Sequence, residues 1–491
     1  MTTKKFKELL VKIRTYNSKA DFDLINKAYR FAVEVHQGQK RLSGEEYILH
    51  PLSVAQSLSD WKLDTVSIVG GLLHDVVEDG GKTLEEVKQK FGEQVEELVD
   101  GVTKIGEFKL RGSREETFVE NLRKMIVVMA HDLRVVLIKL ADRYHNMQTL
   151  EFLPKEKQLR IAKETLEIYA PLAERLGIGE IKGQLEDLAF PYLYPQEYQW
   201  LKDYSRSYFK KADEHIKKVK RKIIKILAKE DIRARVEGRK KHLYSLYQKL
   251  LRPEIDRDIN KIHDLVALRV IVKTVEECYS TLGVIHKFFK PVPSIGIRDF
   301  ISQPKPNGYQ SIHTNVFCFG RITEIQIRTE KMHEQAENGI ATHWYLSEQK
   351  AKGVKDSQVE TGFFAPTQKM AWVRELMKWQ KEITDSREFI DSLKFDALSH
   401  RNFVFSPKGD VFDLPAGATP VDFAYSVHSQ LGDSCAGAKV DGKLVSLDHK
   451  LKSGQVVEIV VNKTKKMPSY DWLKFVVTQK ARQKIAKHFR H

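Results

Sequence analysis

The stretch VGGLLHDVVEDG, residues 69–80, decides how the first part of the chain is interpreted. Apolar residues at three- and four-residue spacing predict a helix, and His74-Asp75 falls in the middle of it. Burying two titratable groups in an apolar helix is costly unless they bind something. Glu78 and Asp79 follow one turn later and can present carboxylates to a water molecule near the same point.

Beyond this stretch, a helical pattern continues almost unbroken over residues 22–198 and predicts an all-α domain. A basic amphipathic stretch, 208–229, leads into short runs that are typical of strands. These runs are residues 232–237, 265–272, 313–319 and 323–327. Strands alternating with helices indicate an α/β domain. Because single cores stop growing at roughly 250 to 300 residues, a chain of 491 residues is expected to form several domains.

The composition, 42% hydrophobic and 30% charged, is that of a soluble globular protein. No tract approaches the roughly 20 apolar residues of a membrane span. Residues 1–12 lack the features of a secretory signal, so a cytoplasmic protein is expected. The widely spaced Cys278, Cys318 and Cys435 are predicted to be buried thiols. The formal charge of +16 favours polyanionic partners such as nucleotides, RNA or ribosomes.

A metal site is predicted from His50, His74-Asp75 and Asp142, because imidazole and carboxylate ligands suit divalent first-row metals. The chain has three His-Asp pairs, at 74–75, 131–132 and 263–264, so the dipeptide alone indicates little. Asp142 also interrupts an apolar run, with Asn146 one turn later. A capped helix end is the alternative interpretation of Asp142.

Phosphoryl-type transfer needs cations against the phosphates, carboxylates for magnesium and a base near the attacking hydroxyl. In GRKKHLYSLYQKL, residues 238–250, Arg239 ends a strand-like run, and three residues spaced by four are expected on one helix face: Lys241, Ser245 and Lys249. A basic helix face can also be merely solvated. Asp264 and Glu324 could face the same side of a sheet as magnesium ligand and base, or be salt-bridged edge residues.

The loop PKPNGYQSIHT, residues 304–314, carries an aromatic residue, Tyr309, that could stack on a base, and His313 near phosphates. Residues 350–362 are predicted to be a linker, followed by an amphipathic helical connector to about residue 395. Short strand-like runs and one helical stretch, 420–431, then predict a small β-grasp-like domain over residues 402–462. Residues 469–491 are expected to be helical.

Three segments, RLSGEEYILHP (41–51), LLHDVVED (72–79) and KLADRYHNMQTL (139–150), resemble the hydrolase half of RelA/SpoT enzymes, which belongs to the HD superfamily of metal-dependent phosphohydrolases. The resemblance implies a manganese ion held by His50, His74, Asp75 and Asp142. It implies that Glu78 and Asp79 act on the attacking water. The residues implied to bind the nucleotide are Arg41, Ser43, Asn146 and Thr149. The family usually has Arg-Lys-Ser where this chain has Arg41-Leu42-Ser43, which would weaken phosphate contacts.

Residues 235–345 resemble the synthetase region of the same family, including its pattern R-x-K-x-x-x-S-x-x-x-K. The resemblance implies that Arg239 and Arg269 sandwich the adenine of ATP and that Asp264 with Glu324 handles magnesium and deprotonation. The other residues implied to bind nucleotides are Lys241, Ser245, Lys249, Lys305, Asn307, Tyr309 (stacked on guanine) and His313. Bifunctional relatives have Arg-x-Lys-Asp before this loop, where this chain has Gly296-Ile297-Arg298-Asp299. The chain keeps one basic residue, Arg298, and this favours the bifunctional class.

Residues 405–445 resemble the TGS domain of the family, in which His428 would contact the acceptor end of tRNA; a packing histidine is the alternative. The chain looks like a truncated or unusually short member. The expected fold class is multidomain α+β, with an all-α HD-type hydrolase domain, a mixed α/β nucleotidyltransferase-like synthetase domain and a β-grasp TGS domain. The expected segments are hydrolase 1–200, synthetase 201–345, linker and connector 346–397, TGS 398–465 and the start of a helical region, 466–491.

The resemblance implies that the chain transfers pyrophosphate from ATP to the 3′-hydroxyl of GDP or GTP, and hydrolyses the resulting (p)ppGpp, with Mg²⁺ and Mn²⁺ at the respective sites. Two opposed activities require a switch, which we expect to couple the sites through the helical junction near residues 195–229. Two alternatives stay open: one silenced centre, or a tRNA- or ribosome-binding regulator with vestigial catalysis.

Overall fold

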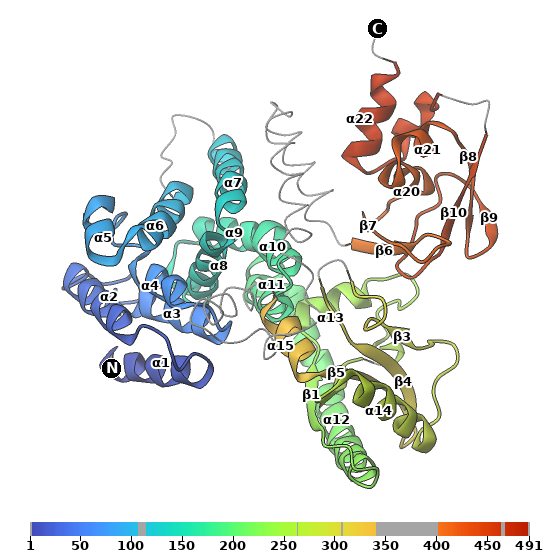
Figure 1. The fold of residues 1–491 in the computed structure, drawn as a ribbon, viewed down its shortest axis with the longest axis horizontal. Helices are drawn as coiled ribbons and strands as arrows, with labels where there is room; N and C mark the ends of the chain where they lie inside the picture. Colours follow the sequence, from blue (N-terminus) through green and yellow to red (C-terminus); the bar gives the residue numbers. More distant parts are fainter. Residues whose placement is uncertain are drawn as a thin grey trace. The chain divides into compact units, whose positions relative to one another are not determined.

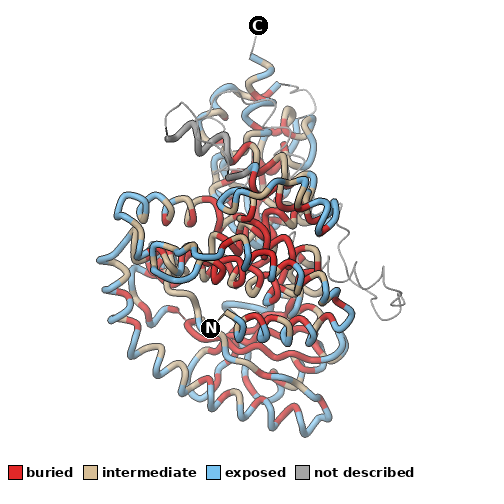
Figure 2. The backbone as a smooth tube through the Cα atoms, turned by 90° about the vertical axis from the view of Figure 1, so that its left-hand side faces the viewer, coloured by how far each residue is buried: buried red, intermediate tan, exposed pale blue. Residues whose placement is uncertain are grey.

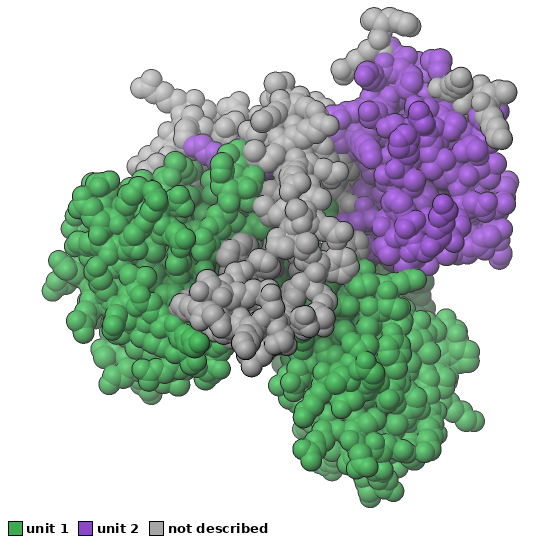
Figure 3. Space-filling model, in the orientation of Figure 1, with its two compact units in different colours: residues 1–110, 127–363 green, residues 111–126, 364–491 purple. Residues whose placement is uncertain are grey.

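A computed structural model describes residues 2–106, 114–262, 264–305, 308–339, 401–462 and 467–489. They fall into two compact units, residues 1–110 with 127–363 and residues 111–126 with 364–491 (Figure 3). The predicted linker and connector, 346–397, lies outside the described residues, and so does Asn307. No helix in the described part of the chain is long and apolar enough to cross a membrane.

The first unit begins with a helical part, as the sequence predicts (Figure 1). Aspartates cap three of its helices, because the carboxylates of Asp21, Asp64 and Asp132 accept from the free amides at the helix starts. The helices of this part are α1 (Thr2–Tyr16), α2 (Phe22–Val35), α3 (Leu49–Asp60), α4 (Thr65–Leu73), α5 (Leu84–Phe91), α6 (Glu93–Gly106), α8 (Leu133–Gln148), α9 (Lys155–Glu164), α10 (Ala170–Arg175), α11 (Gly179–Leu193) and α12 (Pro195–Ala228). Helix α7 (Arg114–His131) is divided between the units, with residues 114–126 in the second.

One detail of this part differs from the prediction. The regular helix α4 ends at Leu73, and His74 is its C-cap residue, so the His74-Asp75 pair follows the helix instead of lying in its middle. The turn after α4 is still tight, because the amide of Asp79 donates to the carbonyl of Asp75 at 2.9 Å.

A five-stranded mixed sheet follows, in the order β1-β2-β5-β4-β3. Only β2 and β5 run parallel; the other neighbouring pairs are antiparallel. The strands are β1 (Arg235–Lys240), β2 (Val266–Val272), β3 (Arg298–Asp299), β4 (Ile312–Cys318) and β5 (Arg321–Thr329), and the helices are α13 (Leu243–Leu250), α14 (Val275–Phe288) and α15 (Glu330–Asn338). The α/β prediction is confirmed, with strand bounds close to the predicted ones and β3 in addition.

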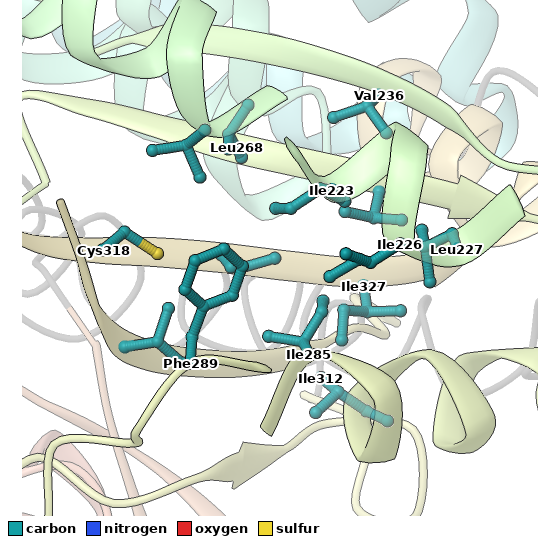
Figure 4. Close-up of a cluster of buried hydrophobic side chains, with 14 of the residues drawn as sticks. Ile223, Ile226, Leu227, Val236, Leu268, Ile285, Phe289, Ile312, Cys318 and Ile327 are labelled. Atoms are coloured by element: carbon teal, nitrogen blue, oxygen red, sulfur yellow. The ribbon is translucent and has the colours of Figure 1, made fainter. Parts of the chain in front are cut away.

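The sheet buries one face against α12 and α14. Figure 4 shows Ile223 and Ile226 of α12, Ile285 of α14 and Ile327 of β5 gathered in this core. Because side chains alternate along a strand, the residues between the core positions of β5 point to the opposite face. Glu324 therefore lies on the face away from this core. Figure 2 colours each residue by its burial, and the buried residues gather in the interior while exposed ones follow the outer turns.

The second unit contains a three-stranded sheet, β10-β8-β9, and the hairpin β6-β7, with helices packed against them. Its elements are β6 (Arg401–Phe405), β7 (Val411–Pro415), α20 (Pro420–Val427), α21 (Ser429–Asp433), β8 (Cys435–Val440), β9 (Lys443–Val445), β10 (Val457–Val461) and α22 (Gln479–Lys487). The predicted helical stretch 420–431 is two helices that meet at His428, and β8 was not predicted from the sequence. The three cysteines are buried thiols, as predicted.

Candidate active sites

Four predicted metal ligands meet inside the helical part. His50 comes from α3, Asp142 comes from α8, and His74 and Asp75 come from the turn after α4. The Nε2 atom of His50 lies 3.3 Å from a carboxylate oxygen of Asp75, 3.3 Å from one of Asp142 and 3.3 Å from the Nε2 atom of His74. The ligand atoms of His50, His74 and Asp142 all lie within 4.8 Å of one another, and these three residues are buried.

The hydrogen bonds around the two imidazoles decide which of their nitrogens face the centre. His74 has its Nδ1 atom 2.9 Å from the carbonyl of Gly71, so Nδ1 carries the proton and Nε2 presents a lone pair. The Nδ1 atom of His145 accepts from the guanidinium of Arg41, so the Nδ1 of His50, 2.9 Å away, is the donor of that pair. Two imidazole lone pairs and two carboxylates thus face one another, an arrangement that a divalent cation stabilises.

Three groups around this centre were missed by the sequence analysis. His145 orients His50 and contacts Arg41, whose terminal nitrogen lies 2.8 Å from it. The hydroxyl oxygen of Tyr47 lies 3.0 Å from a carboxylate oxygen of Asp75 and 2.6 Å from one of Asp79, which share its single proton. The ammonium group of Lys139 lies 3.1 Å from Asp142. The sequence spacing could have indicated them, because residues three apart share a helix face. Tyr47 is three residues before His50, and Lys139 and His145 are each three residues from Asp142.

The predicted water-activating carboxylates, Glu78 and Asp79, are exposed at the rim of the centre. Partial desolvation of the Glu78 carboxyl, opposed by Lys139, raises its pKa to about 7. The hydroxyl of Tyr47 ties Asp79 to the ligand Asp75, whereas Glu78 forms no ion pair or hydrogen bond within the described ranges.

Two of the predicted nucleotide-binding residues of this half, Arg41 and Asn146, contact the same centre. The guanidinium of Arg41 donates to the Asn146 side chain at 2.5 Å, and Asn146 in turn donates to Asp142 at 2.5 Å. Thr149 is the C-cap residue of α8, one turn after His145. The hydroxyl of Ser43 is buried and lacks a hydrogen-bond partner among the described residues. A buried hydroxyl without a partner is costly unless a ligand supplies one.

The other two His-Asp pairs have different surroundings. Asp132 is the N-cap residue of α8, where its carboxylate accepts from the amide of Arg134, so this pair has a structural role. His263 lies outside the described residues, and Asp264 belongs to a second centre on the sheet.

At this second centre, two lysines converge on Asp264. The ammonium groups of Lys241 and Lys249 lie 2.7 and 2.8 Å from its two oxygens. Burial alone would raise the pKa of Asp264, but the two lysines outweigh burial and lower the pKa to about 2. Lys241 precedes α13 and Lys249 is in it, while Ser245 of the same helix donates to Glu186 of α11 at 3.3 Å. The structure thus joins two of the three residues predicted on one helix face.

Glu324 occupies the same face of the sheet. Its carboxylate lies 2.9 Å from the Nδ1 atom of His313 and 3.4 Å from the guanidinium of Arg298. The hydroxyl of Tyr309 is 2.8 Å from the other ring nitrogen of His313. Lys305 lies 5.0 Å from the centre of the Tyr309 ring, so the predicted loop residues gather beside the carboxylate. Repulsion from Asp264 contributes to the pKa of Glu324, which places the two carboxylates near each other.

A cavity of about 670 Å³ has Lys241, one of the two partners of Asp264, in its lining. Arg239 and Arg269 line it, and the strand register puts both on one face, because Arg239 pairs with Ala267, two residues before Arg269. Burial and then the nearby charge of Arg239 lower the pKa of Arg269 to about 10. Two arginines held close together favour a ligand that accepts cation–π contacts and carries negative charge.

Helix α11 connects the helical part with this cavity. It packs against α8 on one side and α13 on the other. Asp187 of α11 accepts from the amide of Tyr244 at 2.9 Å and thereby caps α13 from outside. Asp187 and Glu180 also contact His242, at 2.9 and 3.7 Å, and these carboxylates outweigh burial and raise the pKa of His242 to about 9.

In the second unit, the exposed His428 is the N-cap residue of α21 and accepts from the amide of Gln430 at 3.3 Å. His428 thus has a capping role and is not packed in the core. A contact with tRNA stays a prediction.

Three family profiles match the chain in this order: HD domain over residues 28–179, region found in RelA / SpoT proteins over residues 238–351, and TGS domain over residues 402–461. Each profile matches one of the three folded parts described above. The fold and the two centres therefore define a multidomain protein in which a helical HD metal centre is joined to an α/β site rich in cations.

Curated relatives agree over nearly the whole chain. It is 48% identical over 476 residues to the GTP pyrophosphokinase of Myxococcus xanthus, covering 96% of this chain and 61% of that protein. It is 47% identical over 463 residues to the guanosine-3′,5′-bis(diphosphate) 3′-pyrophosphohydrolase of Aquifex aeolicus, covering 94% and 64%. It is 44% identical over 481 residues to the bifunctional (p)ppGpp synthase/hydrolase SpoT of Escherichia coli, covering 98% and 66%. The chain belongs to the RelA/SpoT homologue family, and it spans less than two thirds of the length of each of these relatives.

Among solved structures, the small alarmone synthetase 1 of Bacillus subtilis bound to its product pppGpp aligns with 38% of this chain and 95% of its own, at 23% identity and a TM-score of 0.24. A likeness at that score adds nothing to the family assignment.

Proposed function

We propose that the chain both makes and removes the 3′-pyrophosphate of guanosine nucleotides, as an alarmone enzyme of the stringent response. One observation carries the proposal: the charged groups that each reaction needs are gathered in space. Four donors converge in the helical part, and paired lysines, paired arginines and two carboxylates share one face of the sheet. The substrates would be ATP with GDP or GTP in synthesis, and (p)ppGpp in hydrolysis.

For hydrolysis, His50, His74, Asp75 and Asp142 would hold the metal, and their mixed imidazole and carboxylate set suits Mn²⁺. A bound metal supplies charge that stabilises the phosphate oxygens and favours deprotonation of water. Glu78 or Asp79 accepts a proton from the attacking water, whose oxygen bonds to the 3′-linked phosphorus. The bond from that phosphorus to the ribose 3′-oxygen breaks, the 3′-oxygen takes up a proton, and pyrophosphate leaves. Arg41 and Asn146 orient the nucleotide through the pair that they already form.

For synthesis, Asp264 and Glu324 offer the oxygen ligands that Mg²⁺ prefers. Arg239 and Arg269 bind the adenine of ATP from two sides, while Lys241 and Lys249 exchange Asp264 for phosphate oxygens. Glu324 takes the proton of the guanosine 3′-hydroxyl, whose oxygen bonds to the β-phosphorus of ATP. The bond between that phosphorus and the α,β-bridging oxygen breaks, and AMP leaves. His313 holds Glu324 in place through its 2.9 Å contact.

The test is to incubate the chain with ATP plus GDP and Mg²⁺, and separately with ppGpp and Mn²⁺, and to separate the nucleotides by chromatography. We expect AMP and ppGpp in the first reaction and GDP in the second. Asp75→Ala should remove only the hydrolysis and Glu324→Ala only the synthesis. A chain without product in either reaction would contradict the proposal, and product in only one would support the alternative of a silenced centre.

The two departures from the family pattern bear on that alternative. Gly296 has a φ of +68°, a left-handed conformation that favours glycine, so the local backbone accounts for its presence. Leu42 is 73% exposed and contributes no charge where relatives carry a lysine. Neither departure removes a metal ligand or a group at the second centre.

We also propose that the two activities are coupled, with nucleotide in one centre disfavouring the competent shape of the other. The expected path was the junction near residues 195–229, and α11 offers a shorter one because it touches α8 and caps α13. Saturation with GDP and a non-hydrolysable ATP analogue should slow the hydrolysis of ppGpp; an unchanged rate would contradict the coupling. Contact of the TGS domain with uncharged tRNA or the ribosome remains a further proposal, through His428.

A further inference from the structure

A second cavity, of about 490 Å³, opens behind the sheet, on the side of α12. We call it the rear hollow; it lies between α12, the short helical turn Ile259–Lys261 and the starts of β2 and β5. The imidazole of His215 in α12 lies 2.8 Å from the hydroxyl of Thr323 and so fixes the helix to β5. Thr323 precedes Glu324, so the rear hollow and the synthetase centre lie on opposite faces of the same strand.

The rear hollow is lined by cations and apolar groups. Lys211, His215 and Arg321 line it, and none of the lining residues is acidic. Burial, and then the charges of Arg321 and Lys218, lower the pKa of His215, which places these two cations close to its ring. Among the residues that the structure describes, Lys211, Lys218 and Arg321 have no acidic partner. A hollow with this charge is suited to phosphate groups.

The cations continue along α12 beyond the hollow. Five exposed lysines, which we call the lysine stripe, follow at spacings of seven, four, three and four residues and so share one face of the helix: Lys211, Lys218, Lys222, Lys225 and Lys229. At 1.5 Å per residue the stripe is about 27 Å long, more than one mononucleotide can span.

Exposed aromatic rings accompany these cations. Phe317 lines the hollow and is 48% exposed, and Phe319, at the tip of the β4-β5 hairpin, is 59% exposed. The Phe319 ring lies 6.5 Å from that of His215. Phe319 has a φ of +46°, in the left-handed region that disfavours a bulky side chain. Phe288 is 43% exposed and lies 5.8 Å from the ammonium group of Lys222.

We propose that the rear hollow and the lysine stripe bind single-stranded nucleic acid, with the phosphates on the cations of α12 and Arg321 and a base stacked on Phe319. Phe319 meets the rings of Phe289 and His215 edge-on, at 6.4 and 6.5 Å, and 59% of the residue stays exposed. A stacked base would cover this exposed part, at a position whose backbone conformation asparagine or glycine adopts more readily. The length of the stripe favours a strand over a free nucleotide. This surface lies apart from both proposed active centres.

The experiment measures binding of a fluorescein-labelled, unstructured RNA of 12 nucleotides to the 491-residue chain, by anisotropy at several salt concentrations. The triple variant Lys211→Ala/Lys218→Ala/Arg321→Ala should weaken binding by about tenfold or more and lower the slope of log affinity against log salt by about 2, since each phosphate contact on a single strand contributes about 0.7. Phe319→Asn should weaken binding by about tenfold while the salt slope stays the same.

The matched control, Lys202→Ala/Arg206→Ala/Lys217→Ala, removes three charges from the cavity on the other flank of α12. It should change the affinity by less than about threefold. An equal loss in both triple variants would show that net charge alone binds RNA and would overturn the proposal. The proposal is also overturned if Phe319→Asn binds the RNA as tightly as the unchanged chain does. Binding of GMP or GDP at this surface, without binding of the RNA strand, would overturn it as well. Each variant should synthesise and hydrolyse the nucleotides at the rates of the unchanged chain, which verifies that it folds correctly.

Discussion

The two centres of the first unit differ in how their charged groups are held before a ligand arrives. In the helical centre, two imidazole lone pairs and two carboxylates face one another, with Lys139 as the one cation in contact with a ligand among the described residues. On the sheet, each carboxylate already has a cation: Asp264 has Lys241 and Lys249, and Glu324 has Arg298.

The difference indicates two ways of preparing a site. The helical centre is organised for a metal and should bind one without rearrangement, because hydrogen bonds to Gly71 and His145 already orient its imidazoles. The centre on the sheet is held together by ion pairs that substrate and Mg²⁺ must replace. Its occupancy should therefore depend on the elements that position those pairs, α11 above all.

Removing a ligand from the helical centre should have the largest effect. His50→Ala leaves the carboxylates facing each other, so the affinity for Mn²⁺ and the rate of ppGpp hydrolysis should each fall by more than about 100-fold, since even outer partners of a metal contribute 10- to 100-fold. Equilibrium dialysis and the hydrolysis assay measure the two. His131→Ala, from a His-Asp pair with a capping role, should change neither. Undiminished Mn²⁺ binding by His50→Ala would refute the ligand assignment.

Asp264→Asn separates the two roles that its position allows. If Asp264 handles magnesium, kcat for synthesis should fall by about 100-fold or more, while KM for ATP should not rise, because the variant frees Lys241 and Lys249 for phosphates. Steady-state kinetics measure both. Asp258→Asn, which alters a carboxylate that caps the turn at Ile259–Lys261, is the control. If Asp264→Asn retained the kcat of the unchanged chain, Asp264 would serve only as an ion-pair partner of the two lysines and would not handle magnesium.

Gly183→Ala tests whether α11 positions the synthetase site. A methyl group there would lie 2.2 Å from the His242 ring, so α11 and α13 must separate or His242 must move. Overpacking of this kind costs about 1–3 kcal/mol, and we expect a lower melting temperature and about tenfold slower synthesis. Gly179→Ala, on the same helix with nothing within 4 Å, is the matched control. Equal rates of synthesis by Gly183→Ala and Gly179→Ala would show that α11 does not position the synthetase site.

The smallest effect should be the pH dependence of the same contact. The pKa of His242 is about 9 in the fold against 6.5 for the free side chain, so its protonated form stabilises the fold fully below pH 6.5, and this contribution is lost as the pH rises through 9. His242→Gln should therefore lower the melting temperature most near pH 6 and least above pH 9. The shift in the pKa of His242 sets an upper limit of about 3 kcal/mol on the contribution of this interaction to the free energy of unfolding. If the difference in melting temperature between His242→Gln and the unchanged chain were constant from pH 6 to 9.5, this charge interaction would be ruled out.

Much of the helical centre could be predicted from the sequence, because His74-Asp75 and Asp142 interrupt apolar runs. The end of α4 at Leu73 could not, since the apolar pattern continues through Val76 and Val77 without a breaker before Gly80. Strand β8, in CAGAKV, was missed because small residues carry little strand signal. The division into the five predicted segments stays a prediction.

What the sequence determined by itself is local: the chemical identity of the ligands, the capping aspartates, and the alternation that separates Glu324 from the core of β5. Local spacing decides these features because it sets which face of an element each side chain occupies. Only the tertiary structure brought His145 to His50, 95 residues apart, and Asp187 to the start of α13. It also placed Arg321 and Phe319 beside α12 behind the synthetase centre. Such contacts depend on how distant elements pack, and short-range patterns carry no record of that packing.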